Sequence, residues 1–477
     1  MENGYVDKRL RRKSLNWYAA MNIANIFISQ FALMYFSSFV SYLFEDYSVY
    51  EKISSVTSYA AYVKLAALVA GAYLAQKMFF TTGKITPLYK KVRWILFIAT
   101  AGCFVDVSFL GAGFSMVYYP VVYLVYQAGI ALLSPIQIAM FLILAGADMD
   151  DRVYATSRTV ITGFFATFIG SFILSNVTNL FLYTADGMMN MWGYLIASAV
   201  MGAIFLIGSE LIIRNISSVE EETSHLPRNP VSRSSFGEMV KDVFTNAPYA
   251  AYWIHSLASY IASAITSSLV MYYWWGIGAF ADYALGSSIT SMISVFGSPV
   301  VALAAKKFLG KKKALYVSAV MEVVMRLMSF VALKISIWAF CVTNGLAMVM
   351  GAINNAYGLN YSLDSAEISM RKTGRDSRIF MVSMLSVSSY ISSFIASPAR
   401  NFIMDVIGYD EVNSYRILGS TVPDALWEVV GGKLAVCMSV IPAMIALVGA
   451  ICLFVMYKTS DEEAVVNAIE NEKYLRM

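Results

Sequence analysis

Long apolar runs, each about the length of a membrane-spanning helix, recur along nearly the whole chain. A hydrocarbon core about 30 Å thick requires roughly 20 apolar residues per α-helix. Backbone polar groups in lipid must bond within a helix or a closed barrel, and no alternating strand pattern competes here. The runs predict twelve spanning helices, near residues 15–44, 54–79, 92–113, 117–145, 154–179, 191–213, 247–275, 280–305, 313–334, 336–360, 379–404 and 432–457.

The composition supports lipid as the surrounding solvent. Of the 477 residues, 58% are hydrophobic and 14% charged, whereas about 25% of a soluble domain is charged. The sequence has no phosphate loop, zinc spacing, dinucleotide fingerprint or Ser/His/Asp catalytic set. We therefore expect neither enzyme activity nor a cofactor or metal, and no nucleic acid as a partner. The apolar runs also contain all four cysteines, which we expect to be free thiols: Cys103, Cys341, Cys437 and Cys452.

Lysine and arginine are distributed unevenly between alternate loops. If the N-terminus is cytoplasmic, the inside segments hold most of the 35 basic residues. The outside segments hold only Lys52, Lys334, Arg400, Arg416 and Lys433. Cytoplasmic loops carry an excess of Lys and Arg. We therefore expect an integral protein of a bacterial cytoplasmic membrane with both termini in the cytoplasm.

A polar stretch divides the chain into two similar parts. We predict a six-helix bundle over 1–214, a cytoplasmic linker over 215–240, a second six-helix bundle over 241–457 and a cytoplasmic tail over 458–477. Basic loops follow span 2 and its counterpart span 8, and mixed-charge loops follow spans 4 and 10. Two pseudo-symmetric six-helix halves resemble the major facilitator fold, in which substrate binds between the halves near the midplane. We expect a monomer that binds a small-molecule substrate and is surrounded by membrane lipid.

The loop after span 10 has the most specific motif. Residues 364–375 read DSAEISMRKTGR, which resembles the Asp-x-x-Glu-Tyr…Lys-Thr-Gly-x-Arg segment of the glycoside–pentoside–hexuronide:cation symporters. Residues 83–87, Arg158 and residues 407–409 resemble other short segments of that family. The resemblance implies a transporter of glycosides, pentosides or hexuronides. We expect this loop to act in gating, through Asp364, Glu367, Arg371, Lys372 and Arg375.

The positions of the family's sodium ligands differ in this chain. Sodium-coupled members have two carboxylates one turn apart in span 2, where residues 62–71 read YVKLAALVAG. The acid of span 4 is replaced by residues 132–135, LLSP, and that of span 1 falls near residues 22–25, NIAN. We therefore predict sodium-independent transport, driven by a proton or, in an exchanger or facilitator, by no coupling ion.

Charged residues inside spans are costly and need a partner or a cavity. We predict that Lys64 of span 2 binds an anionic substrate or replaces the coupling cation, and that it pairs with Asp106 of span 3. Glu322 and Arg326 share a face of span 9, and we favour a structural ion pair over a coupling role. His255 of span 7 suits a proton-coupling group, since the pKa of histidine lies near neutrality, but we favour a helix-packing residue.

Uncharged polar and aromatic residues mark the expected cavity. Amides bind sugar hydroxyls, although helix-to-helix hydrogen bonds explain them equally well. An outer aromatic run, residues 272–275, suits an interfacial belt or a sugar-stacking platform. With Lys64 and His255, the candidate substrate residues are Asn22, Asn25, Gln127, Arg158, Trp274, Asn354, Asn355 and Tyr390.

These features predict a secondary transporter that moves a small polar solute by alternating access. Lys64 favours an acidic solute such as a sugar acid. Two alternatives stay open. The first is a transporter of lysolipids or other amphiphiles, since a lysine can hold a headgroup while the 27 methionines accept a chain. The second is a non-transporting sensor on a transporter fold.

Overall fold

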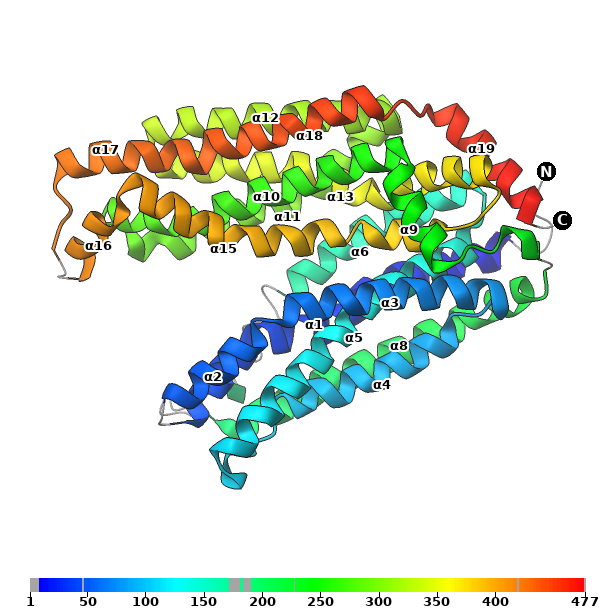
Figure 1. Ribbon diagram of the computed structural model, residues 1–477, viewed down its shortest axis with the longest axis horizontal. Helices are drawn as coiled ribbons and strands as arrows, with labels where there is room; N and C mark the ends of the chain where they lie inside the picture. The colour runs from blue at the N-terminus through cyan, green and yellow to red at the C-terminus, as the bar shows by residue number, and fades with distance from the viewer. Residues whose placement is uncertain are drawn as a thin grey trace. The chain divides into compact units, whose positions relative to one another are not determined.

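The computed structural model describes residues 8–44, 47–170, 181–182, 190–226, 228–417 and 420–475, without the side chains of 47, 306, 352–356, 397 and 416–417. Within these ranges the chain is helical, and its one β-contact is an isolated bridge between Arg233 and Asp376. The α-helices (Figure 1) are α1 (Lys8–Leu43), α2 (Tyr47–Thr57), α3 (Ala60–Thr81), α4 (Thr86–Gly102), α5 (Ala112–Ala145), α6 (Met149–Phe168), α8 (Met191–Ser224), α9 (Phe236–Thr245), α10 (Ala247–Gly276), α11 (Tyr283–Leu309), α12 (Lys311–Ile335), α13 (Ile337–Thr373), α14 (Arg378–Met384), α15 (Val387–Ile407), α16 (Tyr409–Ile417), α17 (Asp424–Ala435), α18 (Ile441–Met456) and α19 (Asp461–Leu475).

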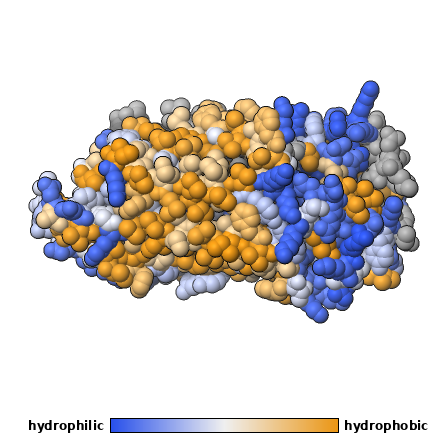
Figure 2. All heavy atoms as spheres, turned by 90° about the horizontal axis from the view of Figure 1, so that it is seen from above, coloured by the Kyte–Doolittle hydropathy of each residue, from blue (hydrophilic) through white to orange (hydrophobic). Residues whose placement is uncertain are grey.

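Helices of the described residues coincide with the predicted spans, and residues 171–179 of the fifth predicted span lie outside the described residues. Nine helical segments of the described residues are long and apolar enough to cross a membrane. The other predicted spans fall on α4, α6 and α13. The prediction of an all-α membrane protein is therefore confirmed. On the face drawn in Figure 2, apolar residues form a broad band and hydrophilic residues gather toward the two ends of the view, as expected of a lipid-embedded protein.

Several span boundaries differ from the prediction, each for a local reason. The third span was expected to continue to residue 113, but α4 ends at Gly102. Asp106 then folds a turn by accepting hydrogen bonds from the Ser108 amide (2.9 Å) and hydroxyl (2.6 Å), and Gly111 adopts a φ of 95° before α5. The last span is interrupted by a π-helical turn at Val436–Val440, and the eleventh by a break between α14 and α15.

The chain forms two compact units whose borders do not follow the midpoint of the sequence. Unit 1 contains Met1–Val240, Glu367–Met384 and Val465–Met477, and unit 2 contains Lys241–Ala366 and Leu385–Ala464. Two short segments from the second half of the sequence therefore belong to the unit built by the first half. The expected division at residues 215–240 into two six-helix bundles stays a prediction.

Close helix approaches hold unit 1 together. Helix α1 packs on α6 and α8, α3 on α5, and α4 on α5 and α8, while α14 lies against α3 and α5. Small residues permit these contacts in a membrane. A Cβ on Gly202 of α8 would lie 2.5 Å from the Phe97 ring of α4, and one on Gly71 of α3 would lie 2.6 Å from the Leu132 side chain of α5.

Unit 2 is organised around α10, which packs on α15 and α18, and α12 also packs on α18. Its larger core joins Trp274 and Leu269 of α10 to Phe340 of α13 and Leu434 of α17. Gly449 of α18 lies against α10, where an added Cβ would contact Ala258 and His255.

We expect Gly449→Ala to destabilise unit 2 by about 1–3 kcal/mol, the usual effect of overpacking. The added Cβ would lie 2.8 Å from the Ala258 Cβ and 3.1 Å from the His255 Cα, and backbone cannot move aside locally. Gly432→Ala is the matched control, because no described atom lies within 4 Å of its added Cβ. Melting temperatures of the purified proteins test this, and equal melting temperatures for the two variants would contradict it.

Candidate gating cluster and substrate residues

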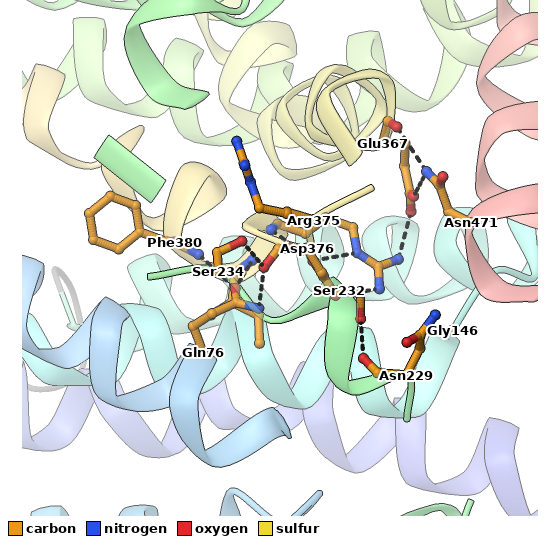
Figure 3. Close-up of polar contacts among 12 residues, drawn as sticks. Gln76, Gly146, Asn229, Ser232, Ser234, Glu367, Arg375, Asp376, Phe380 and Asn471 are labelled. Atoms are coloured by element: carbon orange, nitrogen blue, oxygen red, sulfur yellow. Dashed lines mark hydrogen bonds and ion pairs between the residues drawn. The ribbon is translucent and has the colours of Figure 1, made fainter. Parts of the chain in front are cut away.

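Unit 1 contains a buried cluster of charged and amide side chains around Glu367 (Figure 3), which we call the Glu367 cluster. One carboxylate oxygen, Oε1, accepts hydrogen bonds from Arg152 Nη2 at 2.8 Å and Arg378 Nη1 at 3.0 Å. The other, Oε2, accepts a bond from Asn471 Nδ2 at 2.7 Å, and the same amide nitrogen also donates to the Glu367 carbonyl at 2.8 Å. The cluster thus joins α6, α13, the start of α14 and the C-terminal helix α19.

A tight turn between α13 and α14 positions Glu367 next to Arg378. Helix α13 ends at Thr373, and Gly374 takes a φ of 68°, a conformation that glycine adopts at little cost. Asp376 then holds Arg378 by accepting from its amide (3.0 Å), its Nε (3.0 Å) and its Nη2 (2.8 Å). Gln76 of α3 anchors the turn: its Oε1 accepts from the Ile379 amide at 2.9 Å and its Nε2 donates to the Asp376 carbonyl at 3.1 Å.

The electrostatics of the cluster favour an ionised Glu367. Burial alone would raise the pKa of this carboxyl. The positive charges of Arg378 and Arg152, together with the hydrogen bonds from Asn471 and Arg152, outweigh burial and hold the pKa below its usual value. The Glu367 carboxylate is therefore ionised in a water-poor site between the guanidinium groups of Arg152 and Arg378, where removal of one partner is costly.

The C-terminal helix also makes contacts at the rim of the cluster. Arg371 donates to the Asn467 Oδ1 at 2.9 Å and pairs with Glu470 at 2.5 Å. Arg375 pairs with Glu238 at 3.1 Å, at the start of α9. Lys372 is exposed. In unit 2, Asp364 forms an ion pair with Lys311.

The family resemblance indicated Arg158, which follows the loop after span 4, but the buried arginine of this segment is Arg152. The Arg158 side chain is exposed and lies over the Tyr154 ring, 5.2 Å from its centroid. Arg152 is only 2% exposed, and its Nε donates to the Gly146 carbonyl at 2.7 Å. The acidic N-terminal turn of α6 could have indicated Arg152, since it lies one helical turn after Asp148. The other residues that sequence reasoning did not nominate are Gln76, Asp376, Arg378 and Asn471.

The predicted Lys64–Asp106 ion pair is not formed. Both residues are described, and their side chains make no hydrogen bond or ion pair with each other. Asp106 is exposed in the turn after α4, because that helix ends four residues earlier, and its carboxylate binds Ser108. Lys64 is half-buried in the second turn of α3. Its ammonium group makes no hydrogen bond or ion pair with any described residue.

Three candidate amide side chains lie in unit 1, and they differ in their hydrogen bonding. Asn22 of α1 donates to the Thr159 carbonyl of α6 at 3.1 Å, which is a helix-to-helix bond. Asn25, one turn further along α1, has a buried Oδ1 without a hydrogen-bond partner among the described residues. Gln127 of α5 is 2% exposed and bonds to the Tyr123 side chain. Asn25 and Lys64 therefore retain bonding capacity for a ligand.

Unit 2 contains the expected ion pair of span 9. Glu322 and Arg326 of α12 are both buried, with Arg326 Nη2 2.8 Å from Glu322 Oε1. Ser259 of α10 donates to the same carboxylate oxygen at 2.8 Å, and Arg326 donates to Ser263 at 2.7 Å. His255 is buried on α10 where α18 crosses at Gly449. These contacts join α10 to its neighbours and fit the structural reading.

The remaining candidates also lie in unit 2. Trp274 is 1% exposed and packs edge-on against Trp338, with ring centroids 5.1 Å apart. Its burial in the core excludes ring stacking on a substrate in this conformation and corrects that prediction. Tyr390 is half-buried on α15. The side chains of Asn354 and Asn355 lie outside the described residues.

The helical bundles, the mid-chain polar stretch and the charged turn after α13 together define a major facilitator transporter. Residues 71–461 match the family described as MFS/sugar transport protein. This match covers most of the chain, and the protein belongs to that family. The resemblance to glycoside–pentoside–hexuronide:cation symporters is thereby confirmed.

Solved structures with the same fold have very different sequences. The fucose:proton symporter of E. coli aligns with a TM-score of 0.54 and 15% identity, over 94% of this chain and 98% of that one. A bacterial homologue of the iron transporter ferroportin, in an outward-facing state, aligns with a TM-score of 0.55 and 11% identity, over 93% of this chain and 100% of that one. At these identities the likeness establishes the fold alone. Among curated proteins, none matches the chain by sequence.

Proposed function

We propose that this secondary transporter moves a sugar acid or a related glycoside across a bacterial cytoplasmic membrane, without sodium, as a monomer with both termini in the cytoplasm. Lys64 is the observation that supports an acidic solute. It is a half-buried cation in a membrane helix with no acidic partner among the described residues. An unpaired charge in a span is expensive, so a substrate carboxylate is its natural counter-charge.

The backbone around Lys64 favours an anion as well. The helix breaks at Ser58 and Tyr59, and α3 begins anew at Ala60. A helix N-terminus carries partial positive charge and attracts anions, and broken helices present such ends to substrates in several transporter folds. Lys64 lies in the second turn after this N-terminus, so the lysine charge and the partial charge of the helix end are both positive and both attract an anion. Asn25 adds a buried acceptor that suits a sugar hydroxyl.

The Glu367 cluster would supply the gate. Alternating access requires two states with different contacts, and a ligand shifts their balance only through different affinities for the two. In this structure the segment at 367–384 is fixed to α3 and α6 by charged and amide bonds. We propose that these bonds break when the opposite state forms.

We predict that uptake of the transported solute will not depend on sodium. The described residues contain no group of three or more His, Cys, Asp or Glu side chains that could hold a metal ion, and residues 62–71 lack the acids expected of a sodium site. The measurement is uptake into proteoliposomes from a panel of sugars, sugar acids and lysolipids, in sodium and in potassium buffers at two pH values. Protein-free liposomes are the control. A saturable sodium dependence at fixed pH would refute the prediction, and uptake of lysolipids alone would favour the amphiphile reading.

A further inference from the structure

A groove between α4 and α8 in unit 1 combines charged and apolar walls. It encloses about 380 Å³. Arg93 of α4 and Glu210 and Arg214 of α8 form its polar end, and Trp94, Ile207 and Leu211 contribute apolar surface. None of these residues belongs to the Glu367 cluster or to the candidate substrate residues. The groove lies along the N-terminal half of α4, just after the basic residues Lys90 and Lys91 in the sequence. We expect this end of the helix to be cytoplasmic.

The polar end has more positive than negative charge. Arg93 Nη1 lies 2.7 Å from Glu210 Oε2, and Arg214 Nε lies 3.0 Å from Glu210 Oε1. One carboxylate thus pairs with two guanidinium groups, so the three side chains together carry a net charge of about +1 by simple count. The Arg93 side chain is 10% exposed, and its Nε is buried without a hydrogen-bond partner among the described residues. Guanidinium groups bind phosphate oxygens with paired hydrogen bonds, so the site can accept a phosphate.

The apolar wall continues from the charged end along α8. The exposed residues recur at helical spacing on one side of that helix: Ile196, Val200, Ile204, Ile207 and Leu211. Trp94 is 51% exposed beside the charges, and tryptophan prefers the level of the lipid headgroups. A free phosphate ion would gain nothing from this wall, whereas an acyl chain would cover it.

We propose that this groove binds an anionic phospholipid of the cytoplasmic leaflet, with the phosphate at Arg93 and Arg214 and an acyl chain along α8. Glu210 weakens the site, because it competes with the phosphate for both arginines. The site concerns lipid alone and does not rest on the proposed transport function.

The test is a lipid titration of the full-length purified protein in detergent, read by native mass spectrometry. Phosphatidylglycerol is the probe, and phosphatidylcholine is the zwitterionic comparison, whose choline ammonium cancels the net charge of its phosphate. Arg214→Gln should weaken phosphatidylglycerol binding about fivefold, the usual effect of one basic residue near a lipid surface. Glu210→Gln should strengthen it, because the competing charge is lost. Arg214 is the primary variant, since its side chain is 72% exposed and its loss leaves the fold intact.

Lys91→Gln serves as the matched control, because Lys91 is exposed on the same helix but does not line the groove. If Arg214→Gln weakens binding no more than Lys91→Gln, general surface charge explains the binding and the proposal fails. It also fails if Glu210→Gln weakens binding, which a purely structural ion-pair role would produce. Equal affinity for phosphatidylcholine, or equal displacement by inorganic phosphate, would likewise overturn it.

Discussion

Replacing Glu367 by glutamine is expected to lower the stability of the protein by about 3–5 kcal/mol, the range for breaking a buried ion pair by removing one partner. Arg152 would be left buried with no carboxylate among its described contacts, and Arg378 would retain only Asp376. The measurement is the thermal unfolding of the purified protein in detergent. Glu470→Gln is the control, because its ion pair with Arg371 is about half exposed and such pairs contribute about 0–1 kcal/mol.

A double-mutant cycle distinguishes loss of the Arg152–Glu367 ion pair from a general loss of stability. If Arg152 is stabilised through Glu367, the variant Arg152→Gln combined with Glu367→Gln should be more stable than the sum of the two single changes predicts. Additive losses would contradict the direct contact of 2.8 Å between the two side chains.

The same cluster predicts how stability changes with pH. The folded-state pKa of Glu367 is held below its usual value of 4.5. A carboxyl with a lowered pKa stabilises the folded state at pH values above its unfolded-state pKa, and this contribution is lost as the pH falls through the lower, folded-state value. The wild-type protein should therefore lose more stability than Glu367→Gln when the pH is lowered from neutral to below about 4.5.

The fold was predictable from the sequence because backbone groups in lipid must form their hydrogen bonds within a helix. Each spanning helix also needs apolar side chains to face the lipid, so the spans are recognisable as long apolar runs. The positions where helices end were less predictable. Whether a span continues past residue 102 depends on whether Asp106 can fold back on Ser108, and an apolar run does not encode that hydrogen bond. The predicted Lys64–Asp106 ion pair was wrong for this reason, because the prediction placed Asp106 inside a continuous helix.

The candidate gate was predictable in part. The motif at 364–375 indicated Glu367 through its resemblance to a charged segment of the glycoside–pentoside–hexuronide:cation symporters. Its partners could not be found in the same way. Gln76 and Asn471 lie roughly 300 and 100 residues from their contacts, and an amide in a helix has no local signal that distinguishes a gate contact from ordinary packing. The assignment of Glu367–Met384 to unit 1 is likewise a tertiary property.

Replacement of Lys64 by alanine should leave the protein folded, because the ammonium group makes no hydrogen bond or ion pair with a described residue that its loss would break. Uptake of an acidic solute should fall by roughly thirtyfold or more, equivalent to about 2 kcal/mol for losing one side of a desolvated charge contact. The measurements are the melting temperature and proteoliposome uptake, with the conservative variant Lys64→Arg as the charge-retaining control.

Two mechanisms for Lys64 give different results with a neutral analogue of the solute. If the lysine binds a substrate carboxylate, Lys64→Ala should impair uptake of the sugar acid much more than uptake of the neutral sugar of the same shape. If the lysine replaces a coupling cation, both solutes should be impaired equally, because the charge then acts on the protein's conformational balance rather than on the ligand. Wild-type uptake of both solutes by Lys64→Ala would remove Lys64 from the mechanism. The acidic partner predicted for Lys64, Asp106, bonds to Ser108 instead. A substrate carboxylate would therefore not compete with Asp106 for the lysine, and we expect the first result.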